Sequence, residues 1–298
     1  MNKTLYGYFC ATSGALFWGM SPLYYRLLND YMLIDVVAQR VFWSCVIFGV
    51  ILLAQKRLAE IVVALNSPKK AFLFLICALL IGINWLLFIF ALKYGQLMQS
   101  ALGYYIYPLL TAAMGYYVLG ERLERMTKIA LLFAIAAVLL KASSLTELPW
   151  IAISMAITFA AYAIIRKQLP VKADTGTAIE TIMLTPIAIV YFTWQSQQGV
   201  PLFLGGNMTG LLLAVCCGLF TIIPLYLFHT GNKNLPLAIA GLLFYINPTS
   251  QLIISVLLGE AFSIIDMGVF VLIWVGLIIQ FSPLLLGQKH RLKKPVVE

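Results

Sequence analysis

The chain has 298 residues, of which 62% are hydrophobic and only 10% charged, with a formal net charge of +9. Soluble domains carry about a quarter of charged residues, so this composition excludes an ordinary soluble domain and predicts several membrane-spanning helices. The basic residues stand in short segments between apolar runs, where they act as orientation signals, and we therefore expect no nucleic-acid partner.

Ten apolar runs are long enough to cross a membrane, so the sequence predicts an all-α integral membrane protein with ten transmembrane helices. Most runs reach the roughly 20 residues that a spanning helix needs, and the fifth and sixth are near the lower limit. The first run is too long for the apolar part of a signal peptide, so we expect it to be retained. The predicted spans are 5–25, 33–54, 71–92, 97–119, 127–143, 149–165, 176–195, 209–229, 235–258 and 264–286.

The distribution of Lys and Arg between these runs predicts their orientation. With the N-terminus inside, the inside segments hold 16 basic residues and the outside loops hold 3. Cytoplasmic loops carry the excess of Lys and Arg, so we expect both termini to be cytoplasmic.

An internal repeat relates the two halves of the chain. Segments 101–121 and 240–260 both contain Tyr-Ile-x-Pro and both end in Gly-Glu, about 140 residues apart. A proline inside an apolar span removes a backbone hydrogen bond, so Pro108 and Pro248 should bend their helices at equivalent depths. Gly120 and Gly259, each followed by a glutamate, are plausible ends of these spans.

Each repeat holds five spans, and this odd number means that the second copy starts on the opposite side of the membrane. The sequence therefore predicts two inverted five-helix repeats, an architecture of many secondary transporters with a substrate site between the halves. We place the first repeat at 1–144, the second at 145–286 and a basic cytoplasmic tail at 287–298.

Polar groups and helix breakers within the spans are the candidates for a substrate cavity. Asn84 lies in the middle of the third span, and the repeat places Pro224 opposite it; an interhelical hydrogen bond is an equally weighted role for this amide. Tyr105 and Tyr245 each precede a predicted bend by three residues, where a phenol can cap a freed carbonyl or meet a ligand. The predicted cavity residues are Trp18, Asn84, Trp85, Gln99, Tyr105, Pro108, Pro224, Tyr245, Asn247, Pro248 and Gln251.

Arg40 and Glu180 hold equivalent repeat positions and are candidates for gating or coupling. Inversion places them toward opposite faces, so we do not expect them to pair. Arg40 can snorkel to the interface, with Asp35 and Gln39 satisfying it from the same helix end. Hydrocarbon disfavours a charged carboxylate, so Glu180 is a candidate to exchange protons. The alternative is an ionised Glu180 paired with a basic residue of the cytoplasmic rim, such as Lys167.

The sequence contains no catalytic, metal-binding or cofactor-binding pattern. His229 and His290 have no Ser, Cys or carboxylate pattern beside them, and the five cysteines lack ligand spacing. A nucleotide-binding glycine loop is also absent. We therefore expect no enzyme activity, no metal and no cofactor.

Several short motifs carry a family resemblance. They are Phe17 to Gly19 in the first span, Ala91 to Tyr94 at the end of the third, and Pro-x(10–11)-Gly-Glu at the ends of the fourth and ninth. With the duplicated five-span layout, they resemble the EamA family of the drug/metabolite transporter superfamily. Segments 82–88, 102–109 and 179–181 are similar to its RarD-type members.

This resemblance implies a transporter of small organic metabolites, such as amino-acid-like compounds or drugs, in the bacterial inner (plasma) membrane. Such carriers are often exporters that work by alternating access. A passive channel or facilitator is one alternative, but the polar groups are few and isolated, which suits an occluding carrier better. A membrane sensor is another, although no soluble output domain fits in the short loops. The expected partners are membrane lipid and the substrate, and a homodimer is left open.

Overall fold

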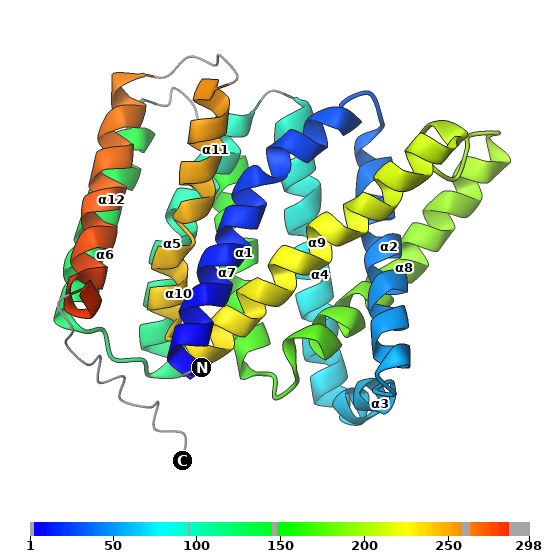
Figure 1. Cartoon of the computed structure of the whole chain (residues 1–298), viewed down its shortest axis with the longest axis horizontal. Coiled ribbons are helices and arrows are strands. Elements are labelled where there is room, and N and C mark those ends of the chain that lie inside the picture. The colour runs from blue at the N-terminus through cyan, green and yellow to red at the C-terminus, as the bar shows by residue number, and fades with distance from the viewer. Residues whose placement is uncertain (1–2, 95, 145–147, 258–262, 286–298) are drawn as a thin grey trace.

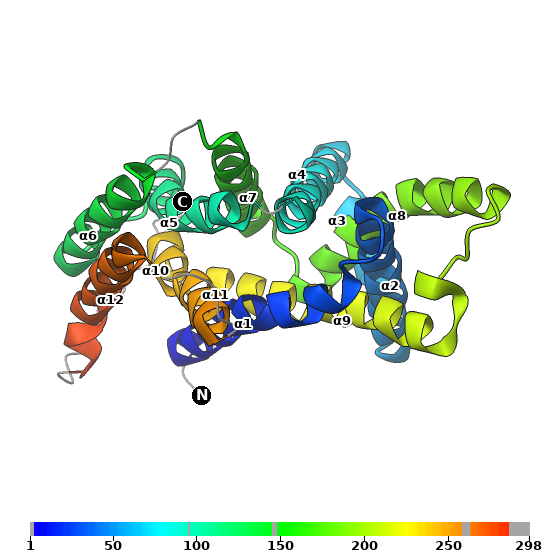
Figure 2. The same ribbon diagram turned by 90° about the horizontal axis from the view of Figure 1, so that it is seen from above.

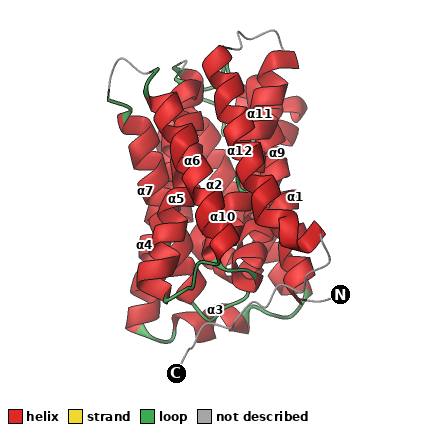
Figure 3. Cartoon of the chain, turned by 90° about the vertical axis from the view of Figure 1, so that its left-hand side faces the viewer, coloured by secondary structure: helices red, strands yellow, loops and turns green. Residues whose placement is uncertain are grey.

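The computed structural model describes residues 3–94, 96–144, 148–257 and 263–285, and its regular elements are all helices (Figure 3). Nine of the ten predicted runs correspond to one helix each, and the ninth run corresponds to two. The long helices are α1 (Lys3–Tyr25), α2 (Leu33–Ala54), α4 (Pro68–Lys93), α5 (Leu97–Leu119), α6 (Arg125–Ala142), α7 (Trp150–Gln168), α8 (Ala173–Gln197), α9 (Met208–Asn234), α10 (Leu237–Leu243) with α11 (Ile246–Leu257), and α12 (Ile264–Leu285). Short elements between them are η1 (Arg26–Leu28), α3 (Ala59–Leu65) and η2 (Leu204–Gly206).

Six helices in the described part of the chain are long and apolar enough to cross a membrane: α2, α4, α7, α8, α9 and most of α12. The chain is therefore a multi-pass membrane protein. The expected number of ten spans stays a prediction.

The helices form two rows, seen most clearly from above (Figure 2). One row holds α6, α5, α7 and α4, the other holds α12, α10, α11, α1 and α9, and α2 and α8 lie together at one end. The beginning of α1 and the end of α12 lie at the same edge of the molecule (Figure 1).

The 140-residue spacing reappears in the helix starts. α2 and α8 begin at residues 33 and 173, α4 and α9 at 68 and 208, and α5 and α10 at 97 and 237. The packing partners are also exchanged between the two repeats. Helix α1 packs against α9, and its counterpart α7 packs against α4. Helix α5 packs against α7, and its counterpart α11 packs against α1. Each helix in one row thus has its counterpart in the other row.

Two contacts fix the relative direction of α1 and α7. Lys93, at the end of α4, donates to the carbonyl oxygens of Asn29 and Tyr31 beyond α1, at 3.2 and 2.6 Å. Gln99, at the start of α5, accepts from the backbone N–H of Ile151 in the first turn of α7, at 3.1 Å. The end of α1 and the beginning of α7 therefore lie at the same edge, and the two helices are antiparallel.

The ninth predicted span is broken between α10 and α11, at Phe244 and Tyr245. Pro248 has no N–H and cannot bond the carbonyl of Phe244 four residues earlier. The N–H of Asn247 donates to that carbonyl instead, at 2.9 Å. The equivalent proline, Pro108, lies inside the unbroken helix α5. The two prolines therefore act differently: one accompanies a helix break and the other does not.

Gly120 ends α5 in the left-handed conformation, with φ of 66°, which glycine adopts without a steric cost. The next residue, Glu121, accepts from the N–H of Leu237 at 2.7 Å and from Lys167 at 2.8 Å, so it joins α5, α7 and α10. The matching pair 259–260 and the tail 287–298, which contains His290, lie outside the described residues.

Candidate functional site

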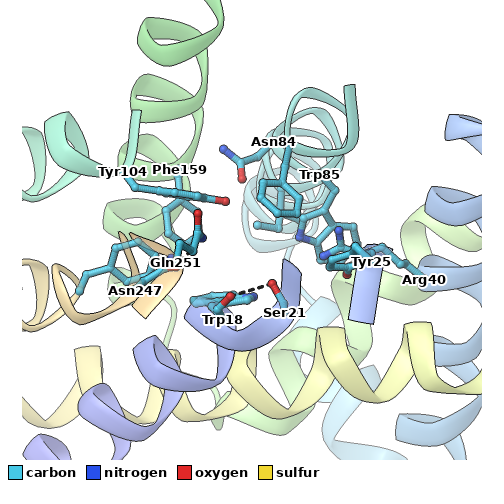
Figure 4. Close-up of a pocket in the computed structure, with 13 residues that line it drawn as sticks. Trp18, Ser21, Tyr25, Arg40, Asn84, Trp85, Tyr104, Phe159, Asn247 and Gln251 are labelled. Atoms are coloured by element: carbon cyan, nitrogen blue, oxygen red, sulfur yellow. Dashed lines mark hydrogen bonds between the residues drawn. The ribbon is translucent and has the colours of Figure 1, made fainter. Parts of the chain in front are cut away.

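A pocket lies where α1, α2, α4, α5, α7 and the α10–α11 break meet (Figure 4). Its walls come from both halves of the chain, as an inverted repeat with a central site requires. The lining residues are Trp18, Ser21, Tyr25, Arg40, Ile81, Asn84, Trp85, Phe88, Tyr104, Phe159, Phe244, Asn247 and Gln251.

The open space between these side chains is about 20 Å³. That is room for one or two water molecules, since a site needs roughly 10–15 Å³ to hold one. Pockets for small organic molecules measure about 300–1,000 Å³. The pocket in this conformation is therefore much smaller than a site for an organic molecule.

The amide groups of the pocket tie helices together and still offer oxygen atoms. The side-chain N–H of Asn84 donates to the carbonyl of Met155 at 3.0 Å and to Thr158 at 3.2 Å, joining α4 to α7. The oxygen of Asn84 points into the pocket (Figure 4). Gln251 donates to the side-chain oxygen of Asn247 at 2.8 Å, which leaves the Gln251 oxygen as an acceptor.

Trp18 closes one side of the pocket with a cluster of aromatic rings. Its ring centroid lies 5.7 Å from Phe159, 5.4 Å from Phe228 and 5.7 Å from Phe244. Phe159 and Phe228 also stack at 5.1 Å, and Tyr107 packs on Phe159 at 4.8 Å. Edge-to-face and offset pairs of this kind are favourable beyond the area they bury, so the rings form a packed barrier.

Arg40 is buried inside the protein rather than extended to the interface, with 3% of its surface exposed. Its Nε donates to the hydroxyl of Thr221 at 3.1 Å. The guanidinium carbon lies 4.8 Å from the ring centroid of Trp85 and 5.3 Å from that of Tyr25. Atom Nη1 is buried without a hydrogen-bond partner.

The expectation that Asp35 and Gln39 satisfy Arg40 is wrong. Asp35 accepts from Tyr191 at 2.6 Å and from Gln195 at 2.9 Å, both on α8. Gln39 donates to the carbonyl of Leu202 at 2.6 Å. These side chains lie close to Arg40 in the sequence, but their partners come from α8 and from the loop that precedes η2.

Tyr105 and Tyr245 do not line this pocket; they pack against each other, with ring centroids 6.1 Å apart. The hydroxyl of Tyr245 donates to the carbonyl of Tyr105 at 2.9 Å. Both rings face the cluster between α6 and α12. The preceding residues, Tyr104 and Phe244, line the pocket instead, because neighbouring helix positions point to different faces.

Four further predicted cavity residues also lie outside the pocket lining. Gln99 accepts from the first turn of α7. Pro224 and Pro108 lie where neighbouring helices pack closely. A Cβ atom added to Gly14 would lie 3.1 Å from the carbonyl oxygen of Pro224, and one added to Gly241 would lie 3.3 Å from the Cα atom of Pro108. The last, Pro248, lies in the first turn of α11. The pocket does include Trp18, Asn84, Trp85, Asn247 and Gln251, together with Arg40.

Glu180 is buried away from the pocket, in a cluster that the sequence did not reveal. Its carboxylate lies 2.9 Å from Arg166 Nε and accepts from the hydroxyl of Tyr162 at 2.8 Å. The Tyr162 oxygen is also 2.5 Å from Nε2 of His229. The Tyr162 hydroxyl has one proton. When that proton is donated to Glu180, the hydroxyl oxygen must accept from the imidazole of His229, so the imidazole proton is assigned to Nε2.

Comparisons with known proteins identify the relatives of this chain. The model of the EamA-like transporter family matches residues 5–142. An "Uncharacterized transporter" of Vibrio cholerae is 33% identical over 274 residues, covering 92% of this chain and 91% of that protein. "Protein RarD" of Salmonella typhi is 34% identical over 280 residues, covering 93% and 95%.

The chain belongs to the EamA-like transporter family. A crystal structure that is 19% identical superposes with a TM-score of 0.68 and covers 97% of this chain and 99% of that one, which shows a shared fold. The family resemblance of the sequence motifs is confirmed, and a membrane transporter is the role that these relatives support.

An ion-pair network joins the two halves of this EamA-like protein at the edge where α2 ends and α8 begins. Arg57 lies 2.6 Å from Asp174 and 2.8 Å from Glu60, and Lys172 lies 2.7 Å from Glu60. Hydrogen bonds from Arg57, Lys172 and Thr175 hold the pKa of the Glu60 carboxyl well below its ordinary value. The network thus fastens α3 to the start of α8.

Arg166, Tyr162 and His229 were missed for identifiable reasons. A count of basic residues treats Arg166 as an orientation signal of an inside segment, and no Ser, Cys or carboxylate pattern stands beside His229 in the sequence. Only four residues separate α7 from α8. A hairpin this short brings residues on its two arms together, and this was the available signal that Arg166 could reach Glu180.

Proposed function

We propose that this transporter is a secondary carrier that exports small organic metabolites, such as amino-acid-like compounds or drugs, by alternating access. It would move its substrate without altering it. The supporting observation is the contracted pocket between the two halves of the chain, whose walls include rings and amides but leave only about 20 Å³ open. A site that must widen to bind suits a carrier better than a permanently open channel.

The proposed membrane arrangement is ten spans in two inverted repeats, at 1–144 and 145–286, in a bacterial inner membrane. The antiparallel α1 and α7 support it, as do the exchanged packing partners of the two rows. With both termini cytoplasmic, the edge that holds the end of α1 would face outward. The pocket residues Ser21, Tyr25 and Arg40 would then lie on the outer side, and Glu180 on the inner side.

In this orientation, two barriers would separate the pocket from the cytoplasm. The first is the ring cluster around Trp18, and the second is the buried group of Arg166, Glu180, Tyr162 and His229. The ion pairs of Arg57 would close the cytoplasmic edge. Release of these contacts would open the site inward, and their formation would close it.

Glu180 is also our candidate for coupling transport to protons, because a buried carboxylate that changes partners can bind and release a proton. The pair with Arg166 favours the ionised form, whereas burial opposes it. An imposed pH gradient across proteoliposomes decides between these effects. A transport rate that follows the gradient supports coupling, and an unchanged rate makes this a facilitated carrier.

Counterflow in proteoliposomes tests the carrier proposal. Vesicles loaded with a mixture of unlabelled amino acids and related metabolites are diluted into labelled compounds, and transient uphill uptake is measured. A carrier exchanges outer label for inner substrate, whereas a channel only equilibrates the label. Everted and right-side-out cell vesicles then give the direction.

A pair of matched substitutions links counterflow to the pocket. Gln251→Ala removes an amide from the lining, and Gln198→Ala removes one from an exposed loop. We expect lower uptake for the first and unchanged uptake for the second. Uptake without any counterflow phase would refute the carrier, and equal loss in both variants would refute the pocket.

A further inference from the structure

The charge of Arg40 has no counter-charge in the described part of the chain. None of the ion pairs in these ranges involves Arg40. The carboxylate on the same helix, Asp35, is occupied by Tyr191 and Gln195. A buried ion that lacks a partner is costly, and its donor Nη1 is unsatisfied as well.

The immediate surroundings of Arg40 compensate its charge only in part. Trp85 and Tyr25 offer their ring faces to the guanidinium, and Thr221 accepts one N–H. Cation–π contacts attract the charge weakly compared with a carboxylate, and they leave the forked donor edge of the group free. That free edge belongs to a side chain that lines the pocket.

The pocket as a whole is suited to negative charge. Among its lining residues Arg40 is the ionisable group with a permanent charge, and the lining contains no Asp or Glu. A cationic ligand would meet Arg40 without a carboxylate to balance it. A ligand with one carboxylate would supply the missing counter-charge and two acceptor oxygens for the guanidinium fork.

The rest of the lining defines the remainder of the ligand. The rings of Trp18, Trp85 and Tyr104 line the pocket from different sides and provide apolar walls for the body of the ligand. The oxygens of Asn84 and Gln251 lie on the side of the pocket opposite Arg40 in Figure 4. An apolar body therefore fits between the cationic end and the amide end.

We propose that Arg40 is the carboxylate-binding residue of this pocket and that the transported compounds are organic monocarboxylates with an apolar or aromatic body. This inference deepens the proposed carrier function and rests on it. Arg40 then stabilises the substrate-bound state by an ion pair that the empty protein lacks. The preference follows from charge: a carboxylate binds, whereas the matching amide or amine does not.

Three compounds with one shared body test the preference on the unaltered protein. Phenylacetate, phenylacetamide and 2-phenylethylamine carry a negative, a neutral and a positive group on the same ring. Binding is measured by the shift in melting temperature of the purified protein, with sodium chloride added to equalise ionic strength. We expect phenylacetate to raise the melting temperature and the other two compounds to have little effect.

Two substitutions locate the effect. Arg40→Gln removes the fork, and Arg26→Gln removes an exposed arginine of η1, directly after α1, as a matched control. A charge-assisted hydrogen bond of ordinary strength predicts roughly 10- to 100-fold weaker binding of phenylacetate to Arg40→Gln and unchanged binding to Arg26→Gln. Arg40→Lys keeps the charge without the fork and should bind with intermediate strength.

Several outcomes would overturn the inference. These are equal or stronger binding of the amide or the amine to the wild type, undiminished binding of phenylacetate to Arg40→Gln, or no binding of any of the three compounds. The wild-type ranking stands even where a variant does not fold. Counterflow of other metabolites would still support the carrier in each case, so the two proposals fail separately.

Discussion

Nε of Arg166 lies 2.9 Å from a carboxylate oxygen of Glu180, and both side chains are completely enclosed between α7 and α8. The two atoms are in ion-pair contact rather than in an aligned hydrogen bond. Arg166 also donates to the carbonyl oxygens of Lys172 and Ala173, at 3.1 and 3.2 Å, and lies over the ring of Phe74. The arginine thus closes the turn between the two helices.

Removal of one charge from this pair should destabilise the protein strongly. Glu180→Gln leaves Arg166 buried without a counter-charge, and breaking a buried pair in this way costs about 3–5 kcal/mol. We expect a large fall in the melting temperature of the purified protein. The double variant Arg166→Met/Glu180→Leu should be less destabilised than Glu180→Gln, because it leaves no lone charge. A single variant as stable as the wild type would contradict the assignment.

Gly176 provides a second test of the same contact, without a change of charge. A Cβ at this position would collide with the guanidinium of Arg166, so Gly176→Ala should push Arg166 away from Glu180. Overpacking of this kind costs about 1–3 kcal/mol. Gly49→Ala is the matched control, since nothing lies within 4 Å of its added Cβ. We expect a lower melting temperature for the first variant and an equal or higher one for the second.

The helices could be predicted from the sequence because hydropathy and span length are local properties. The runs at 33–54 and 97–119 match α2 and α5 within a residue. The side-chain partners were not accessible, because they depend on helix rotation and on which helices become neighbours. Choosing Tyr105 rather than Tyr104 missed the pocket by one position, which is about 100° around a helix. The burial of Arg166 is likewise hidden from the sequence, because a count of basic residues does not distinguish an exposed charge from a buried one.

The network around Glu60 predicts a pH dependence of stability. The pKa of Glu60 is well below its ordinary value of 4.5 in the folded protein, so its stabilising contribution is fully present above pH 4.5 and is lost progressively as the pH falls from 4.5 through the lower pKa of the folded state. We expect Glu60→Gln to lower the melting temperature at pH 7 and to differ less from the wild type at pH 3, where the unfolded state has already taken up the proton.

Arg57→Gln removes the first cause of this shift, and it should reduce the pH dependence that Glu60 confers. The double variant Arg57→Gln/Glu60→Gln shows whether the two residues act together: if they do, its loss of melting temperature is smaller than the sum of the two single losses. A Glu60→Gln effect that is the same at both pH values would contradict the linkage.

The orientation can be tested by cysteine labelling in a background without the five native cysteines. Lys69→Cys and Gln198→Cys place exposed thiols at opposite edges of the molecule. The basic-residue count predicts that an impermeant maleimide labels position 198 from outside intact cells and position 69 only after permeabilisation. The reverse labelling pattern would show that the protein has the opposite orientation in the membrane. Labelling of both positions from the same side would exclude the ten-span topology.

Pro248 provides the last prediction, because its missing N–H accompanies the break that presents Phe244 and Asn247 to the pocket. Pro248→Ala restores a donor for the Phe244 carbonyl, so α10 and α11 can join into one regular helix. Such a change would rotate Phe244 and Asn247 relative to α1. We expect counterflow to fall sharply while the amount of protein in the membrane is retained.

Pro108→Ala is the comparison, since α5 is already continuous and Pro108 lies outside the pocket lining. It should reduce transport less. Loss of membrane protein in parallel with activity would show that Pro248 supports folding alone, and unchanged counterflow would show that the break does not shape the site.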